Sequence, residues 1–586
     1  MTTTLILPEP AQPAPPRGQR PGEVLLVLAL GTAVFYAAFG FGILNPAHIE
    51  WLMHGDPAQH YFGWAFFRQE PWGWPPGLLV GLAAPLQTSI VFTDSIPLLA
   101  LPLKLLDPLL PGTFQYFGLW MLSCYLLLAL FAWRLLTRLI PPSTSAGAAI
   151  RLLGVLLILL SPPLLLRGYG HEALMAHWLI LAAINETLNP YRNRRWMLWL
   201  GLAVLTHAYL ALMVAAFWFA SFVHALIQRS LGLPKLLIGS ALLWAGLLAL
   251  AWLAGYVVPG SSALTAQGYG NYSANLLTYF DPMNWHAFLE TFNRIDPQAA
   301  EWSRLLPSLG QAHYDQYEGF AYLGAGGILL LILATSLHLV ARRPDKCSAS
   351  GKPFPPPDAL HLSGLQTDLR PALLMACFLF VLGLSTHVTL GSHSLLTYHW
   401  PTPIQHILEI FRASGRFVWP LYYLILILGV ATLAQQLRPP LALPALGLIV
   451  ALQIFDLAPK FGEFHRHHQQ TSIELSTPVM PGGAANWASL SQNAARLIVL
   501  PRPQGDDYLP WVRLALAHRL SLNLGIVARA DNDALLAHDA AILHALGSDS
   551  GTFPPGSIIV LTDPGIPVNP AHRPLAQDGV RIILAR

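Results

Sequence analysis

Long apolar stretches, separated by short polar connections, fill the chain from residue 24 to residue 458. Most of them approach the roughly 20 residues that an α-helix needs to cross a bilayer, so each predicts a transmembrane helix. The run 195–228 is divided in two because it is too long for one helix. The pattern predicts about eleven spans, at 24–43, 113–133, 150–166, 173–189, 195–207, 208–228, 236–258, 319–340, 371–390, 416–436 and 440–458.

Two shorter apolar segments, 77–92 and 95–110, leave the number of spans open. Three prolines interrupt them: Pro85, Pro97 and Pro102. Proline removes a backbone donor and breaks helices. The segments are either a hairpin through the membrane, which raises the number of spans to about thirteen, or a re-entrant pair within a first outer loop, 44–112.

The chain changes character after residue 460. Four short apolar runs that are typical of buried strands lie at 496–501, 522–529, 557–563 and 580–586. Residues 531–546 have a helical pattern, and turns rich in Gly, Pro and Asp separate the pieces. We therefore expect a small α/β domain over 461–586, joined to a membrane domain over 23–460 by the stretch His465–His468. This stretch is expected to be a solvated linker, and the alternative is an outward-facing metal-binding segment.

Composition supports a membrane protein. The 586 residues are 54% hydrophobic and only 11% charged, with a mean hydropathy of +0.49. Soluble domains carry about 25% charged residues, so we expect most of this chain in lipid. A net charge of +3 gives no indication of a nucleic-acid partner. No P-loop is present, so no nucleotide cofactor is expected, and Pro-rich residues 1–22 are expected to be disordered.

Basic residues fix the expected orientation, because lysine and arginine accumulate in cytoplasmic connections. With the spans above, the basic clusters all fall on one side: Arg17, Arg20, Arg134, Arg138, Arg151, Arg192, Arg194, Arg195, Arg229, Lys235, Arg342, Arg343, Lys346, Lys352 and Arg438. That side and the N-terminus are therefore expected in the cytoplasm. The outer side receives the loops 44–112 and 259–318 and the C-terminal domain.

Polar and aromatic residues are mixed in Leu52–Arg68, LMHGDPAQHYFGWAFFR, directly after the first span. Asp56, Pro57 and Gln59 have the types and spacing of a helix N-cap, a first-turn proline and a capping box. A helix that begins there puts His60 one turn above Asp56 on the same face. Asp56 is either a structural cap or a catalytic carboxylate at the membrane–water boundary, and the two roles are compatible.

Further polar residues gather on the outer side, each with a structural alternative. Asp94 in VFTDSIP is either a site residue or a helix cap. His171 and Glu172 open a span, where an acid in the first turn also favours the helix dipole. Arg167 lies just before them, on the side where the charge bias predicts no arginine.

Arg412 and Arg416, in FRASGRF, precede a late span. If 411–417 is helical, they stand one turn apart on one face. Two guanidiniums so placed can bind a phosphate or pyrophosphate bidentately; the alternatives are snorkelling to the interface or pairing with loop carboxylates. His177 and His207 lie within spans and are more typical of packed core histidines than of ligands.

An apolar first helix, an acid just after it in a long outer loop, about eleven spans and an outer C-terminal domain resemble the GT-C superfamily of membrane glycosyltransferases. The segments that carry the comparison are HGDPAQHYFGWAFFR, RGYGHEALMAHW, YEGFAYLG and FRASGRF. The resemblance covers roughly residues 24–460 and extends to bacterial polytopic membrane proteins of that type. It implies an α-helical polytopic membrane fold with a small extramembrane α/β domain.

The resemblance also implies a function in the bacterial inner (plasma) membrane. The enzyme would transfer a sugar from a polyprenyl-phosphate-linked donor to a glycan, lipid or protein acceptor of the cell envelope, on the outer face. Asp56 would be the base or a metal-assisted activator of the acceptor hydroxyl. The further catalytic candidates are His60, Asp94, His171 and Glu172.

The donor phosphate would be held by Arg412, Arg416 and Arg167. A divalent ion, Mg²⁺ or Mn²⁺, would be held by Asp56 and His60, and the alternative is that His60 carries the proton itself. The rival functions are a transporter or flippase of lipid-linked glycans and a non-catalytic scaffold of the cell envelope.

Overall fold

A computed structural model gives the fold of most of the chain. The described residues are 21–140, 145–230, 232–258, 269–291, 298–341, 368–469, 483–503, 505–525, 527–528, 531–549, 551–577 and 580–585. The expected disordered segment up to residue 20 lies outside them, as do the basic residues Arg17, Arg20, Arg342, Arg343, Lys346 and Lys352. Residues 21 and 22, which were expected to be disordered, begin the first helix.

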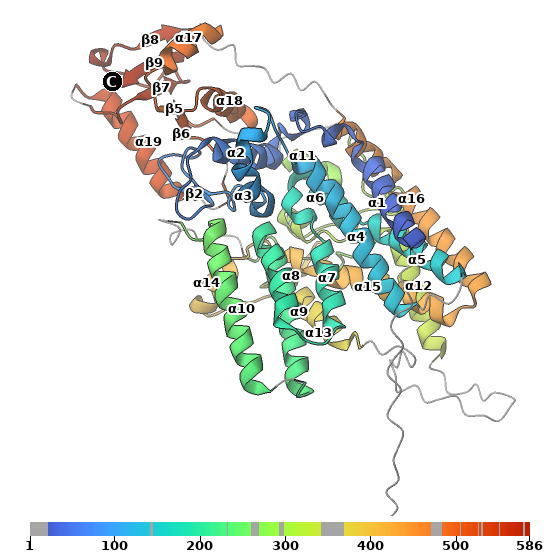
Figure 1. Cartoon of the computed structure of the whole chain (residues 1–586). Coiled ribbons are helices and arrows are strands. Elements are labelled where there is room, and N and C mark those ends of the chain that lie inside the picture. Colours follow the sequence, from blue (N-terminus) through green and yellow to red (C-terminus); the bar gives the residue numbers. More distant parts are fainter. Residues whose placement is uncertain are drawn as a thin grey trace, which may run out of the picture.

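Seven helices in the described part of the chain are long and apolar enough to cross a membrane. They are α1 (Pro21–Phe39), α4 (Phe117–Leu139), α9 (Ala208–Ile227), α10 (Leu233–Ala254), α12 (Gly324–Ala341), α15 (Trp419–Gln436) with the preceding turn η7 (Ser414–Val418), and α16 (Pro439–His468). Their length and mean hydropathy agree with a membrane protein (Figure 1).

The expectation of about eleven spans is too high when only helices long and apolar enough to cross a membrane are counted, because breaks divide several apolar stretches. α5 (Ser145–Leu159) and α6 (Pro162–Gly170) meet at 41° where two prolines begin α6, and as one bent span they raise the number to eight. Three helices are shorter: α7 (Trp178–Thr187), α8 (Asn193–Thr206) and α13 (Arg370–Leu384). His207 is extended between α8 and α9, with φ −165° and ψ 138°.

The segments 77–92 and 95–110 form no spanning hairpin, so the higher expectation of about thirteen spans is wrong for the described residues. The first segment contains two short antiparallel strands, β1 (Leu78–Leu79) and β2 (Thr88–Ser89). The second contains α3 (Pro97–Leu105). A helix of that length is about 14 Å long, less than half of the hydrocarbon core. Both segments belong to the loop between α1 and α4.

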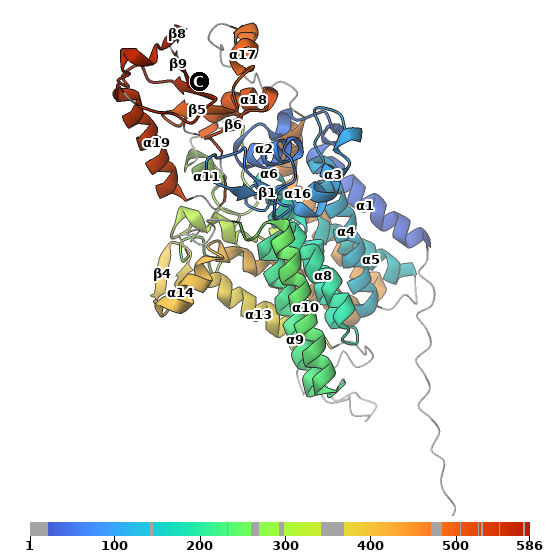
Figure 2. The ribbon, with the colours of Figure 1, turned by 60° about the vertical axis from the view of Figure 1, so that its left-hand side comes forward.

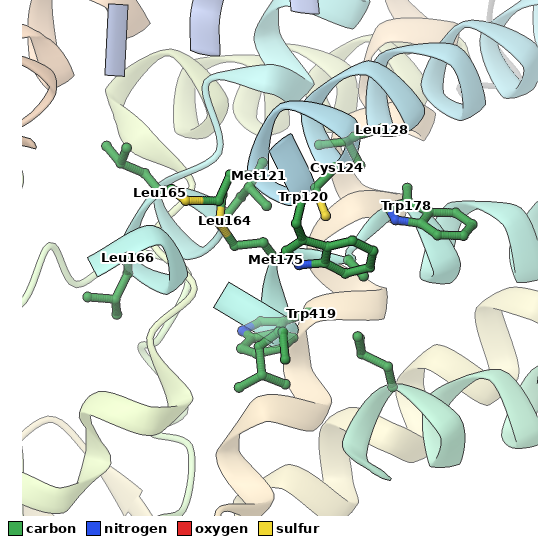
Figure 3. Packing of buried hydrophobic residues seen from close by; sticks show 14 of the residues in the cluster. Trp120, Met121, Cys124, Leu128, Leu164, Leu165, Leu166, Met175, Trp178 and Trp419 are labelled. Carbon is green, nitrogen blue, oxygen red and sulfur yellow. The ribbon is translucent and has the colours of Figure 1, made fainter. Parts of the chain in front are cut away.

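Large side chains pack densely where α4, α6, α7 and α15 meet (Figure 3). Trp120 and Cys124 of α4, Leu164 of α6, Trp178 of α7 and Trp419 of α15 are all buried there. Helices in lipid associate through close packing rather than through removal from water. This contact therefore holds the broken ends of α6 and α7 in place beside the site described below.

Five strands form the C-terminal sheet, in the order β6-β5-β7-β9-β8. They are β5 (Arg496–Leu500), β6 (Ser521–Leu522), β7 (Ser557–Leu561), β8 (Leu575–Gln577) and β9 (Val580–Ala585). β5 pairs in parallel with β6 and β7, whereas β9 is antiparallel to β7 and β8. Helix α19 (Asn532–Gly547) covers one face with Ile542 and Leu546. Three of the four expected strands and the expected helix are present, and β8 is additional. The fourth expected strand, 522–529, is wrong in extent, because β6 shares only Leu522 with it.

The stretch His465–His468 is not the solvated linker that its composition predicts. It forms the last turn of α16, which runs past the expected domain boundary at 460. His468 is buried, and its Nε2 lies 3.0 Å from the Gly168 carbonyl oxygen. These residues therefore pack against α6 as part of the helical bundle.

Backbone hydrogen bonds join the C-terminal sheet to the loop between α1 and α4. The Leu522 amide donates to the Gly81 carbonyl, and the Ala84 amide donates to the Leu522 carbonyl. The Ala83 amide donates to the Leu524 carbonyl. This pairing extends the sheet beyond its edge strand β6. In two views the sheet lies at one end of the helical bundle, beside this loop (Figure 1 and Figure 2).

Candidate functional site

Helix α2 (Gly55–Gln69) carries the first expected site residues, and it begins earlier than its sequence predicts. His54 occupies the N-cap position, so Asp56 lies within the first turn. The Gly55 amide donates to Asp506 Oδ1 of the C-terminal region, 3.0 Å away. Asp56 is therefore not the N-cap that the capping-box pattern predicts. Its side chain is 48% exposed.

Asp94 lies in the loop before α3 with a left-handed backbone, φ 57°, which residues other than glycine rarely adopt. α3 begins without a side-chain cap, so Asp94 does not cap it. The neighbouring residues fix this loop on α2. Ser95 Oγ donates to the His60 carbonyl over 2.8 Å, and Gly63 approaches so closely that a Cβ there would lie 2.2 Å from Thr93 Oγ1.

The break between α6 and α7 places His171 and Glu172 beside α2. Glu172 opens the turn η4 (Glu172–Met175) and is fully buried, and its Oε2 accepts a hydrogen bond from His60 Nδ1. Burial lowers the pKa of His60, but the charges of Glu172, Asp94 and Asp56 raise it by more, so that the pKa is about 9. Glu172 therefore has a role besides the expected interaction with a helix dipole: it accepts a hydrogen bond from His60 and raises the pKa of that histidine.

Asp94 is the centre of a group that we call the histidine cluster: Asp94, His60, His171 and His207. Asp94 Oδ2 lies 3.6 Å from both His60 Nε2 and His171 Nδ1, and Asp94 Oδ1 lies 3.6 Å from His207 Nε2. Asp56 Oδ2 lies 3.5 Å from His171 Nε2. Burial raises the pKa of Asp94, but the three histidines lower it more, to well below its ordinary value.

Three members of the histidine cluster could together hold a metal ion. His60, Asp94 and His171 each offer one ligand atom, and in the described part of the chain these atoms form the one group of this kind within 4.8 Å of one another. Asp56 is not a member and contacts the group through His171. Of the expected pair Asp56 and His60, only His60 belongs to this group of possible ligands, which is centred on Asp94.

Two buried arginines share one carboxylate in a second group, the arginine cluster: Arg167, Arg416 and Glu318. Glu318 Oε2 accepts from Arg167 Nη1 and Arg416 Nε, each over 2.9 Å, and Oε1 accepts from Arg416 Nη2. Burial raises the pKa of Glu318, but the two arginines lower it well below its ordinary value. One positive charge remains in excess. Arg167 Nε and Nη2 have no hydrogen-bond partner among the described residues.

Arg412 does not join Arg416 as the sequence predicts. The segment before α15 is the tight turn η7, which begins at Ser414, so the two arginines do not share one α-helical face. Arg412 is exposed, with its guanidinium 5.3 Å from the Tyr272 ring. Arg416 is buried and pairs through Glu318 with Arg167.

The start of α9 connects the two clusters. His207 Nδ1 accepts a hydrogen bond from the Tyr209 amide over 3.2 Å, and the two rings lie 5.5 Å apart. The Tyr209 ring in turn lies 4.6 Å from the guanidinium of Arg416. Burial raises the pKa of Tyr317, and the charges of Glu318 and Asp56 raise it further, so one phenol interacts with the acid of the arginine cluster and with Asp56, the neighbour of His171.

Two members of the clusters were not predicted as site residues. Glu318 lies in YEGFAYLG without an assigned role, and His207 has the apolar surroundings of a core histidine. Two features could have identified Glu318: it lies directly before a span, and it lies on the expected outer side, as Arg167 and Arg416 do. His177 fits the expectation of a core histidine, since it is buried with Nδ1 2.7 Å from the Tyr423 hydroxyl.

Comparison with known protein families gives two matches. A family model described as "Domain of unknown function (DUF6311)" matches residues 28–458, and a model described as "DUF6311 C-terminal domain" matches residues 486–583. The curated proteins contain no match to the chain. The first family model covers every residue of the histidine and arginine clusters, and the second covers Asp506.

Proposed function

Because the chain belongs to the DUF6311 family, which is described without a function, we propose an activity from its site: transfer of a sugar by a membrane glycosyltransferase. The donor is a polyprenyl-phosphate-linked sugar, and the acceptor is a hydroxyl of a glycan, lipid or protein of the cell envelope. The observation that carries the proposal is a partly exposed carboxylate and histidine cluster beside a buried arginine pair with excess positive charge. The resemblance to the GT-C superfamily supports the same reaction.

Asp56 is the proposed base. It is 48% exposed, whereas the side chains of Asp94 and Glu172 are 13% and 0% exposed, so Asp56 is the acid that an acceptor reaches first. The acceptor oxygen attacks the anomeric carbon of the sugar, and its proton passes to Asp56. His171, 3.5 Å from Asp56, stabilises the carboxylate in its position.

Arg167 and Arg416 are the proposed ligands of the donor phosphate. As the bond between the anomeric carbon and the phosphate oxygen breaks, its electron pair remains on the lipid phosphate. Fixed cations stabilise such developing charge, and guanidiniums bind phosphate through paired hydrogen bonds. The two donors of Arg167 without a partner among the described residues support this role. Glu318 holds the pair in place, and the donor phosphate competes with it.

We place this site on the outer face of a bacterial inner membrane. Arg229 lies in the connection between α9 and α10, and Lys235 lies in the first turn of α10. This connection lies at the end of the bundle away from the C-terminal sheet (Figure 1 and Figure 2). Positively charged connections stay in the cytoplasm. The sheet, α2 and both clusters then face outward, where lipid-linked sugars are used without nucleotides.

Transfer in proteoliposomes tests the proposal. The full-length protein is combined with a panel of labelled polyprenyl-phosphate hexoses and with envelope glycans and lipids as acceptors. We expect transfer by the wild type and at least about 100-fold less by Asp56→Asn. Asp507→Asn, which changes an exposed acid of the C-terminal region, should retain full activity. Wild-type transfer by Asp56→Asn rules out its role as the base. Movement of intact donor across the bilayer without transfer favours a transporter instead.

A further inference from the structure

The rings of His60 and His171 each lie between Asp94 and a second, outer carboxylate. A histidine that binds a metal ion through one nitrogen usually donates the N–H of its other nitrogen to a carboxylate, which fixes the tautomer and the orientation of the ring. In His60 this nitrogen is Nδ1, which donates to Glu172 Oε2. Nε2 of the same ring lies 3.6 Å from Asp94 Oδ2, and metal binding at Nε2 releases the proton that it carries in the imidazolium form.

His171 has the same arrangement with its two nitrogens exchanged. Its Nε2 faces Asp56 Oδ2 at 3.5 Å, and its Nδ1 faces Asp94 Oδ2 at 3.6 Å. This Nδ1 is buried and has no hydrogen-bond partner among the residues that the structure describes. A buried polar atom of this kind requires an explanation, and an ion is one of them.

Three potential ligand atoms therefore lie close together: His60 Nε2, His171 Nδ1 and Asp94 Oδ2 are all within 4.8 Å of one another. Without a metal ion, protons on the imidazoles balance the charge of Asp94 at this point, and a divalent ion that binds there takes their place and releases them. His207 differs, because its Nδ1 accepts from the Tyr209 amide and its proton is therefore on Nε2. That nitrogen faces Asp94 Oδ1 and orients the carboxylate.

We propose that His60, Asp94 and His171 bind one divalent transition-metal ion, and we assign it as Zn²⁺. Two imidazoles and one carboxylate are the ligands of zinc sites that keep a coordination position open. Imidazole favours zinc and its neighbours, whereas magnesium prefers oxygen. Glu172 and Asp56 then orient the two metal-binding rings from behind, as carboxylates do in many metal sites. The inference replaces the expected Mg²⁺ or Mn²⁺ and does not depend on the proposed sugar transfer.

The backbone of Asp94 supports a specific role for its side chain. A left-handed conformation at a residue other than glycine is unfavourable, and such residues cluster at functional sites. The conformation holds the carboxylate toward three histidines instead of toward the start of α3. Asparagine tolerates the left-handed region as aspartate does. Asp94→Asn therefore removes the charge without changing the backbone preference.

Metal content tests the proposal independently of activity. The full-length protein is purified with a tag that lacks histidine, stripped with a chelator, incubated with Zn²⁺ or with Mg²⁺, desalted, and analysed by elemental mass spectrometry. We expect about one zinc and no magnesium per chain. His171→Ala and Asp94→Asn should each retain less than about a tenth of that zinc, and Glu172→Gln should bind it about 10–100-fold more weakly.

A second histidine pair provides the matched control. His387 Nδ1 lies 3.2 Å from His313 Nε2, outside the cluster, so His387→Ala should keep all of the zinc. Size-exclusion elution and circular dichroism check that each variant is folded. If Asp94→Asn does not fold, His171→Ala decides, because its side chain is 25% exposed and its loss is milder.

Three results would overturn the proposal. They are less than about 0.1 zinc per chain in the wild type, equal zinc in the wild type and His171→Ala, and binding of Mg²⁺ in preference to Zn²⁺. Cobalt(II) in place of zinc gives a second readout. Its visible absorption should appear in the wild type and be lost in His171→Ala, and absorption that is equal in both also contradicts the assigned ligands.

Discussion

Glu318 holds two buried arginines together, and its replacement by glutamine tests whether they form an anion site. In the wild type its carboxylate accepts one hydrogen bond from Arg167 and two from Arg416. Glu318→Gln preserves the size and shape of the side chain. In this variant no carboxylate of the cluster compensates the charges of Arg167 and Arg416, so the net charge of the arginine cluster is +2 instead of +1.

The expected loss of stability follows from the burial of this group. The side chains of Arg167, Glu318 and Arg416 are 3%, 5% and 8% exposed, so water screens their charges little. Removal of one partner from a buried ion pair costs about 3–5 kcal/mol. We expect about 3 kcal/mol, because the glutamine oxygen still accepts a hydrogen bond from one arginine.

The pH dependence of this loss has a definite sign. The pKa of Glu318 lies well below its ordinary value of 4.5, because the two arginines outweigh the effect of burial. A carboxylate with a lowered folded-state pKa stabilises the protein above its ordinary pKa, and the stabilisation is lost as the pH falls through the folded-state value. The wild type and Glu318→Gln should therefore differ fully at neutral pH and converge only in strong acid.

Thermal unfolding in detergent, followed by tryptophan fluorescence, measures both effects. Pyrophosphate should raise the midpoint of Glu318→Gln more than that of the wild type, since the anion replaces the missing carboxylate and binds the folded state. Glu186→Gln is the control, because Glu186 is also buried but pairs with a single exposed arginine, Arg195. Equal responses of all three proteins to pyrophosphate would refute the anion site.

Three further substitutions test the parts that support the clusters. Gly63→Ala should destabilise the protein by about 1–3 kcal/mol, because the added Cβ overpacks against the loop of the histidine cluster. The thermal midpoint measures this loss. Gly112→Ala is the control and should not lower the midpoint, because nothing lies within 4 Å of its Cβ. Asp506→Ala should lower the free energy of unfolding by about 1 kcal/mol and speed amide hydrogen exchange in the first turn of α2. If Asp506→Ala and the control Asp507→Ala exchange at equal rates there, Asp506 does not cap the helix. Arg416→Lys should raise the KM for the lipid-linked donor without changing the thermal response to acceptor, because lysine cannot bind phosphate bidentately.

Most helices and strands were predictable from the sequence, because their apolar periods follow from local geometry. The expected strands at 496–501 and 557–563 match β5 and β7 closely. The breaks were harder to predict. The prolines that begin α6 are visible in the sequence, but the extended His207 between α8 and α9 is not, since its conformation is set by packing. Counting apolar windows therefore gave too many spans.

The site was predictable as a set of residue types and not as a set of partners. Asp56, His60, Asp94, His171 and Glu172 were all expected, and the structure brings them together. Their pairing could not be predicted, because it depends on the left-handed turn at Asp94 and on helix ends far apart in the chain.

The arginines show the same limit of sequence reasoning. The spacing of Arg412 and Arg416 indicated a pair on one helix, but a tight turn separates them. Arg167, the partner that Arg416 has in the structure, lies in a distant helix and is reached through a carboxylate that no spacing rule identifies.

The pairing of Gly81, Ala83 and Ala84 with the edge of the C-terminal sheet has a consequence for how the family can diversify. Two family models divide the chain, which invites exchange of the second part between relatives. The hydrogen bonds cross that division, and the Ala528 amide adds another one to Phe92, close to Asp94. A transplanted C-terminal part would leave β6 with an open edge that is prone to aggregation. Exchange of the second part alone would therefore also break backbone hydrogen bonds of the loop between α1 and α4.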